Sequence, residues 1–232
     1  MRILIKFASR SRPQKFFNCL DNIISNCESK DFKILASLDI DDETMNNETV
    51  IEKLKTYECL DYFFGFSKNK IDAVNRDMDL SGKWDILINT SDDMWFVQKG
   101  FDEQIRKDML THFPDLDGVL HYNDGFQGQN CMTMSIMGRK YYERDNFIYN
   151  PVFESLWSDV VAQETAIVRG KYKYIGDDRI LFNHLHPSFG VAEYDKQYLS
   201  TEGMEVRQRD YNRYLELKKE YDKEGAFKVR SI

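Results

Sequence analysis

The feature that most constrains the fold is the alternation of strand-like and helix-like segments in the first 110 residues. Short β-branched and aromatic runs are followed by stretches whose apolar residues recur on one helix face. The strand-like runs cover residues 3–7, 34–38, 62–64 and 84–89, and the helical spacing covers 16–27, 50–57 and 71–78. Strands that alternate with helices across short connections predict a parallel sheet covered on both faces. We therefore expect an α/β fold.

The order of elements changes beyond about residue 112. Strands are expected at 118–122 and 132–137, and a helix is expected at 159–168 with Asp159 as its capping residue. The apolar spacing over 204–221 predicts a closing amphipathic helix. There is no repeat and no Pro/Gly-rich linker, so we expect one domain over residues 1–232.

The charge and the apolar pattern exclude several classes of protein. The chain has 39 acidic and 32 basic residues, a formal charge of -7, and no block of like charges, which argues against a protein that coats nucleic acid. No apolar run approaches the ~20 residues of a membrane span, and residues 1–8 are not followed by the apolar segment of a signal peptide. Four scattered cysteines do not make a disulfide scaffold. A soluble, cytoplasmic protein is expected.

Polar residues concentrate where the predicted strands end. The residues concerned are Ser9, Arg10, Ser11 and Arg12 after the first strand, Asp39, Asp41 and Asp42 after the second, and Thr90, Ser91, Asp92 and Asp93 after the fourth. One acidic turn alone is most often a solvated turn or a helix cap. Ligands of open parallel sheets bind at the carboxyl ends of the strands, so three polar turns at equivalent positions predict a ligand site there.

The adjacent acids Asp92 and Asp93 carry the most specific information. Two neighbouring carboxylates at a strand end repel each other unless a cation lies between them, and a divalent metal with oxygen ligands is a common solution. Mg²⁺ or Mn²⁺ held by one or two carboxylates usually completes its coordination with water and phosphate oxygens. A metal-bound diphosphate is therefore the expected ligand.

Four segments together resemble a nucleotide-sugar glycosyltransferase of the GT-A fold, similar to family 2. They are Ser-Arg-Ser-Arg-Pro at 9–13, Leu-Asp-Ile-Asp-Asp at 38–42, Lys-Asn-Lys-Ile-Asp-Ala-Val-Asn at 68–75 and Ser-Asp-Asp at 91–93. The resemblance covers residues 3–190 and implies a Rossmann-like, mostly parallel sheet flanked by helices, with a smaller antiparallel acceptor-side part. It divides the domain into a nucleotide-binding part (about 1–111), an acceptor-side part (about 112–203) and a C-terminal helix and tail (204–232).

The resemblance also implies roles for individual residues. The donor nucleotide would be bordered by Ser9, Arg10, Arg12, Pro13, Asp39, Asp41, Lys70, Asn75 and Asp92. Asp93 would be a direct metal ligand, while Asp92 would contact a sugar hydroxyl or support the ligand. The first position of the usual Asp-x-Asp motif is Ser91 here, so the motif departs from its strict form. The alternative interpretation is a solvated turn for Arg10 and Arg12 and a helix-surface position for Asn75.

Two histidines, His184 and His186, stand two residues apart near the end of the resembling region. In an extended strand both would face one side, before Pro187 ends regular pairing. The resemblance implies that one of them completes the metal site; paired surface or core histidines are the alternative. Imidazole suits Mn²⁺ better than Mg²⁺, so manganese is favoured.

A catalytic base is expected at the start of the helix that follows the metal motif. Inverting transfer needs a carboxylate that takes the proton of the acceptor hydroxyl, and Asp159 matches that place in the family. Glu164 and Asp124 are weaker substitutes. Simple capping of the helix is the alternative role for Asp159.

The interpretation is a metal-dependent enzyme that moves a sugar, with inversion, from a nucleotide diphosphate sugar to an acceptor hydroxyl. A UDP-sugar is the favoured donor, and the acceptor stays open among a glycan, a small molecule and a modified nucleobase. One rival is a sugar nucleotidyltransferase, which would carry a glycine-rich loop where Ala8-Ser-Arg-Ser-Arg12 stands. The other is a non-catalytic module that binds nucleotide or glycan.

Overall fold

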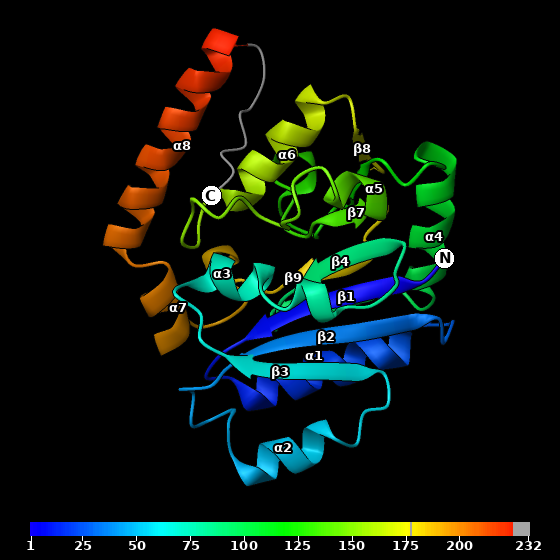
Figure 1. Ribbon diagram of the computed structural model, residues 1–232, viewed down its shortest axis with the longest axis vertical. Helices are drawn as coiled ribbons and strands as arrows, with labels where there is room; N and C mark the ends of the chain where they lie inside the picture. Colours follow the sequence, from blue (N-terminus) through cyan, green and yellow to red (C-terminus); the bar gives the residue numbers. More distant parts are fainter. Residues whose placement is uncertain (177, 225–232) are drawn as a thin grey trace.

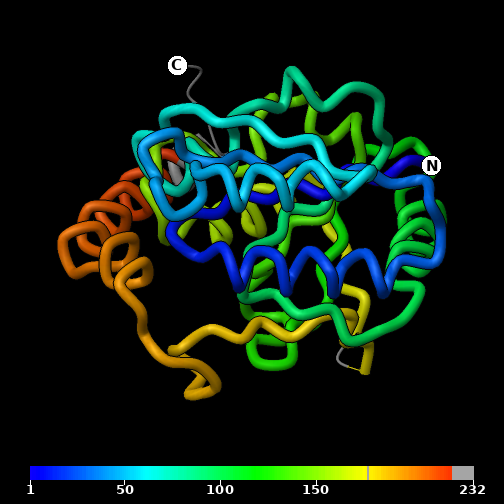
Figure 2. Tube along the Cα trace, turned by 90° about the horizontal axis from the view of Figure 1, so that it is seen from below, coloured from blue at the N-terminus to red at the C-terminus, as the bar shows by residue number. Residues whose placement is uncertain are grey.

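The molecule is a central sheet with helices on both faces. The computed structural model describes residues 1–176 and 178–224, and Figures 1 and 2 show it in two perpendicular views. The expected tail at 225–232 lies outside the described residues.

Within the described residues, seven of the nine strands form one mixed sheet. The strands are β1 (Ile3–Ser9), β2 (Phe32–Asp39), β3 (Leu60–Gly65), β4 (Ile86–Thr90), β5 (Met94–Phe96), β6 (Val119–His121), β7 (Ile136–Gly138), β8 (Tyr172–Tyr174) and β9 (Phe182–His184). The sheet order is β3-β2-β1-β4-β7-β6-β8; neighbours from β3 to β4 are parallel, whereas β7 is antiparallel to both β4 and β6. Strands β5 and β9 form a separate antiparallel pair. The expected α/β fold, with a mostly parallel sheet and an antiparallel part, is confirmed.

Helices fill most of the connections. They are α1 (Pro13–Asn26), α2 (Glu48–Leu54), α3 (Lys70–Asn75), α4 (Phe101–His112), α5 (Arg139–Tyr142), α6 (Ser158–Val168), α7 (Lys196–Thr201) and α8 (Met204–Glu224). Helix α1 begins at its proline, because a proline in the first turn lacks only an N–H that would have no helical partner. Short 3₁₀ turns lie at Met78–Leu80, Gly128–Asn130 and Pro187–Phe189.

The sheet separates two hydrophobic cores. In β1, Ile3, Ile5 and Phe7 pack with α1 and α4 on one face, while Leu4 packs with α3 and α6 on the other. This alternation is the period of two of a strand that is buried on both faces. In Figure 1 the arrowheads of β1 and β3 point to the side of the molecule where α7 and the start of α8 lie.

Some local expectations were wrong. The strand expected at 132–137 covers only Ile136–Gly138. Asp159 does not cap α6: the capping position belongs to Trp157, whose φ of 65° is in the left-handed region, and Asp159 lies in the first turn. The Trp157 ring stacks on Tyr214 of α8 with centroids 5.0 Å apart. A positive φ is uncommon for a residue other than glycine, and at Trp157 it occurs together with this packing against α8.

All four cysteines are free; Cys19 and Cys27 are buried, and Cys59 and Cys131 are half-buried. Among the described helices, none is long and apolar enough to cross a membrane.

Candidate functional site

The loops at the carboxyl ends of the parallel strands surround a cavity of about 410 Å³. This volume lies within the usual range for small-molecule sites. Its lining includes Ser9, Arg10, Arg12, Asp39, Asp41, Lys70, Asp92 and Asp93, all predicted from the sequence. The strand-end loops therefore converge on one cavity, as the parallel topology requires.

Other predicted residues do not line this cavity. Pro13 begins α1, and Asp159, His184 and His186 are also absent from the lining. Asn75 holds a distant segment of chain: its amide donates to the Tyr149 carbonyl oxygen at 2.7 Å, and its Oδ1 accepts from two backbone N–H groups of the same segment. These contacts fix the backbone near residue 149.

One end of the cavity is a network of charged and hydroxyl groups. Arg10 donates to both oxygens of Asp41, at 2.7 and 3.1 Å, and to Asp39 at 2.9 Å. The Ser67 hydroxyl donates to the other oxygen of Asp39 at 2.6 Å. These groups offer fixed donors and acceptors to a polar ligand.

Two lysines add positive charge to the cavity. Lys68 and Lys70 line the cavity and are exposed. Neither forms an ion pair with any residue in the described ranges 1–176 and 178–224. An anionic group in the cavity could pair with both lysines without first breaking a salt bridge.

The two adjacent acids have different partners. Asp92 accepts from Arg12 at 3.0 Å and from the Ser9 hydroxyl at 3.1 Å. Burial and, to a lesser degree, the neighbouring charge of Asp93 raise the pKa of Asp92, although Arg12 opposes this. The protein thus supplies its own cation to Asp92.

Asp93 is held by three side chains. The Ser91 hydroxyl donates to Oδ1, the Tyr198 hydroxyl donates to Oδ2 at 2.7 Å, and Nε2 of His184 lies 3.5 Å from Oδ2. Burial tends to raise the pKa of Asp93, but His184 and Ser91 hold it well below its usual range. Asp93 therefore remains a carboxylate at neutral pH.

The pairing of β5 with β9 brings His184 to Asp93. Met94 lies opposite His184 in that pair, and the Leu185 N–H donates to the Asp93 carbonyl oxygen at 2.7 Å. The other imidazole nitrogen, Nδ1, is 3.7 Å from Asp124. Burial lowers the pKa of His184, but the carboxylates of Asp124 and Asp93 outweigh burial and raise it to about 9. Without a metal ion, His184 is thus a second internal cation beside the acid pair, and its Nε2 must release its proton before it can bind a metal.

His186 has other partners. Its Nε2 lies 3.2 Å from Glu202, and its Nδ1 lies 2.7 Å from the Ser188 hydroxyl. The two histidine rings are 5.3 Å apart between centroids, but they serve separate carboxylates.

The fit to a divalent metal rests on two atoms. Oδ2 of Asp93 and Nε2 of His184 are 3.5 Å apart, a spacing compatible with neighbouring ligands at ~2.1 Å from one ion. Within the described parts of the chain, no three His, Cys, Asp or Glu side chains gather around a common point. The pair fits Mn²⁺ if water and phosphate oxygens complete the coordination.

The candidate bases differ in the hydrogen-bond donors that their carboxylates bind. Asp124 is buried and accepts from the Phe126 and Gln127 N–H groups and the Thr133 hydroxyl. Glu164 accepts from Tyr214 and Lys218 of α8. Asp159 is half-buried; its Oδ1 accepts from the Val160 N–H, and the Cys131 thiol is 3.4 Å from its Oδ2.

The opposite wall of the cavity was not predicted from the sequence. It consists of Glu154, Ser155, Gln197, Tyr198, Ser200, Thr201 and Val206. Asp210 of α8 fixes one part, because its buried carboxylate accepts from the N–H groups of residues 154–156, each at 2.9 Å, and pairs with Arg213 at 3.0 Å. Asp195 caps α7 and binds Arg12 at 2.6 Å. The capping Asp before a short helical run was the only local signal for this wall.

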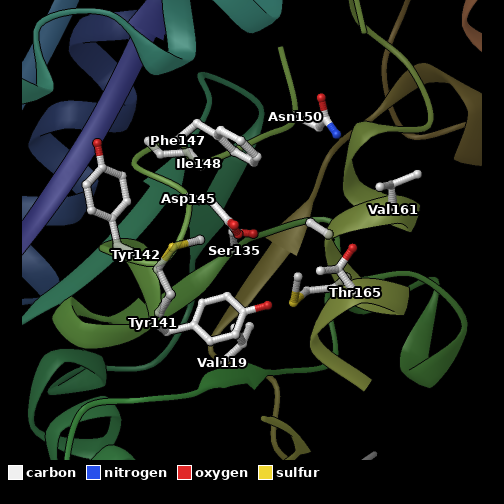
Figure 3. A pocket seen from close by; sticks show the side chains of 13 residues that line it. Val119, Ser135, Tyr141, Tyr142, Asp145, Phe147, Ile148, Asn150, Val161 and Thr165 are labelled. Carbon is white, nitrogen blue, oxygen red and sulfur yellow. The ribbon is translucent and has the colours of Figure 1, made fainter. Parts of the chain in front are cut away.

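A second, much smaller cavity lies between α6 and β7. Figure 3 shows its lining, which includes Tyr141, Val161 and Thr165. Its volume of about 30 Å³ leaves room for one or two water molecules. It is too small for a nucleotide or a sugar.

Comparison with known proteins places the fold. No family model and no curated protein matches the sequence. A mannosyltransferase, PcManGT from Pyrobaculum calidifontis, in complex with GDP-Man and Mn²⁺, superposes with a TM-score of 0.62 and 13% identity, over 78% of this chain and 56% of the other. S. aureus TarS (residues 1–349) gives a TM-score of 0.61 at 10% identity, over 93% of this chain and 72% of the other; TarS has also been solved with UDP-GlcNAc.

A 4-diphosphocytidyl-2C-methyl-D-erythritol synthase from Anaerococcus prevotii gives a TM-score of 0.51 at 10% identity, over 76% of this chain and 88% of the other. The chain spans little more than half of the mannosyltransferase's length. At these identities the likeness concerns the fold, and the chain has the GT-A glycosyltransferase fold.

Proposed function

We propose that this protein is a metal-dependent glycosyltransferase that uses a nucleotide diphosphate sugar. The observation that carries the proposal is the strand-end cavity, in which two lysines, Lys68 and Lys70, share the lining with the Asp92–Asp93 turn. A diphosphate needs such cations, and a divalent ion beside Asp93 would add to them. The ligands of the fold neighbours, GDP-Man with Mn²⁺ and UDP-GlcNAc, belong to the same chemical class; we favour a UDP-sugar.

Different residues of the chain would bind the different parts of the donor. Arg10, Asp39 and Asp41 would bind the nucleoside, and Lys68 and Lys70 would bind the diphosphate. Asp93 and His184 would hold Mn²⁺ or Mg²⁺. That ion, when bound, would stabilise the negative charge that develops on the departing diphosphate.

Asp159 is the base that we favour for inverting transfer. It stands four residues after Ser155 of the cavity wall, whereas Glu164 pairs with the Lys218 ammonium and Asp124 accepts from three donors. A carboxylate oxygen of Asp159 would accept the proton of the acceptor hydroxyl as the glycosidic bond forms. We propose a glycan, a small molecule or a modified nucleobase as acceptor, and a cytoplasmic site of action.

The test is release of nucleoside diphosphate from UDP-glucose, UDP-GlcNAc and GDP-mannose in the presence of Mn²⁺, with water or an added acceptor. Asp159→Asn should lower kcat on the order of 100-fold or more and leave UDP binding unchanged. Glu164→Gln, on the same helix, is the matched control and should turn over at the wild-type rate. Loss of turnover in Glu164→Gln but not in Asp159→Asn would overturn the assignment of the base.

A sugar nucleotidyltransferase is the second candidate, because the 4-diphosphocytidyl-2C-methyl-D-erythritol synthase named above shares the fold at a TM-score of 0.51. Such an enzyme transfers the nucleotide of a nucleoside triphosphate to a sugar phosphate, and the triphosphate loses pyrophosphate. Pyrophosphate release without turnover of any nucleotide sugar would favour it. Binding with no turnover of either kind would favour a non-catalytic module.

A further inference from the structure

Tyr198 of α7 contacts the acid pair from the far end of the sequence. Its hydroxyl donates to Oδ2 of Asp93 at 2.7 Å across 105 residues of chain. The residue lines the cavity and is 4% exposed. A tyrosine hydroxyl is protonated at neutral pH, so it donates to the carboxylate.

The same hydroxyl completes the set of groups that orient Asp93. Ser91 donates to the opposite oxygen, and His184 lies 3.5 Å from the oxygen that Tyr198 binds. A carboxylate that accepts at both oxygens is fixed about its terminal bond, so its remaining lone pairs point in defined directions. Without the tyrosine hydroxyl, that oxygen would keep the longer contact with His184 at 3.5 Å.

The ring of Tyr198 orients the partner of the other acid. The Arg12 guanidinium lies 3.9 Å from the ring centroid, a cation–π contact. Arg12 in turn donates to Asp92 at 3.0 Å and to Asp195, three residues before Tyr198, at 2.6 Å. One side chain therefore contacts both Asp93 and the cation that pairs with Asp92.

We infer that Tyr198 is a positioning residue of the donor site. Its hydroxyl orients the Asp93 carboxylate for a divalent ion, and its ring orients the Arg12 guanidinium. The inference rests on the proposed function and adds a residue from the C-terminal segment to the site. Removing a group that orients a metal ligand typically costs 10- to 100-fold in metal affinity. The hydroxyl should therefore matter only when the metal is present, whereas the ring should matter with or without it.

The experiment is a calorimetric titration of UDP into wild type and Tyr198→Phe, once with Mn²⁺ and once with EDTA. Phenylalanine keeps the ring over Arg12 and removes only the hydroxyl. We expect binding about 10-fold weaker with Mn²⁺ and unchanged with EDTA. Tyr198→Leu, which also removes the ring, should weaken binding under both conditions.

Tyr194→Phe is the matched control, because Tyr194 is exposed and packs edge-on against Tyr198 at 6.1 Å; its affinities should equal those of wild type. A thermal melt of each variant checks that it is folded. Equal Mn²⁺-dependent affinity of Tyr198→Phe and wild type would overturn the inference. So would tighter binding by the variant, since the hydroxyl would then compete with the ion. Wild type that binds neither UDP nor GDP with Mn²⁺ would overturn the proposed function itself.

Discussion

The two walls of the cavity are built in different ways. The strand-end wall carries Ser9–Arg12, Asp39–Asp41 and Ser91–Asp93, and it rests on parallel strands buried on both faces. The helical wall carries 154–155 and α7, and a few polar contacts hold it in place. The sheet positions the residues of the strand-end wall, whereas individual side-chain contacts position the residues of the helical wall. Substitutions should therefore disturb the helical wall more easily.

Asp210→Ala should cause the largest change in stability. It removes a buried carboxylate that accepts from three backbone N–H groups and pairs with Arg213, and those donors lose their partner. Leaving a buried backbone donor without an acceptor costs about 1–3 kcal/mol in the free energy of unfolding, so a loss of at least that size is expected by urea denaturation, whereas Arg213 is half-exposed and water can solvate its charge. The control is Glu205→Ala on the same helix, whose carboxylate is 93% exposed and should change stability by less than about 0.5 kcal/mol. Equal effects of the two variants would mean that α8 does not hold the helical wall in place.

Arg12→Ala separates the two walls, because Arg12 joins Asp92 to Asp195 and Tyr198. Calorimetry should give UDP binding weaker by about 100-fold, the loss expected for strong charge-assisted hydrogen bonds. Arg12→Lys should be intermediate, since an ammonium cannot replace a planar two-armed donor. Lys15→Ala, which removes the other cation on Asp195, should change the affinity less than threefold. Wild-type affinity in Arg12→Ala would contradict the bridge between the walls.

Lys6→Met tests the sheet on which the strand-end wall rests, through the pH dependence of the free energy of unfolding. Lys6 is fully buried in β1, where it donates to the Ser37 hydroxyl, and burial lowers its pKa to about 7. Between pH 7 and 10 the unfolded chain holds a proton on this lysine that the folded protein lacks. Wild-type stability should therefore rise with pH relative to Lys6→Met, by up to ~1.4 kcal/mol per pH unit, and the difference should level off below pH 7. Parallel stability curves over pH 7–10 would show that Lys6 is charged in the folded protein.

The strand-end wall could be predicted from the sequence, whereas the helical wall could not. Strand periodicity located β1, β2 and β4, and the polar turns follow those strands directly, so parallel topology alone brings them together. The contacts of Tyr198 with Asp93 and of Asp210 with residues 154–156 join segments far apart in the sequence, and the helical period that predicts α8 does not reveal these partners. Their partners depend on how the C-terminal helices pack.

The same distinction applies within the predicted site. The sequence suggested that Asp92 and Asp93 need a cation between them, and the structure provides Arg12 for one and His184 for the other. His184 reaches Asp93 only because β9 pairs with β5, and the short β5 was not predicted. Asn75 was expected beside the nucleotide, but its amide binds the backbone at residues 148–149; a single side chain in a helical segment does not reveal which of its faces meets a neighbour.

The most direct test of the central claim is metal-dependent nucleotide binding by Asp93→Ala. Calorimetry of UDP and GDP, with Mn²⁺ and with EDTA, should show that wild type binds at least one of them more tightly with Mn²⁺. Asp93→Ala should lose that metal-dependent gain, on the order of 100-fold, and keep the weaker affinity measured in EDTA. The account would be contradicted if wild type bound neither nucleotide with Mn²⁺, or if Asp93→Ala kept the full metal-dependent gain.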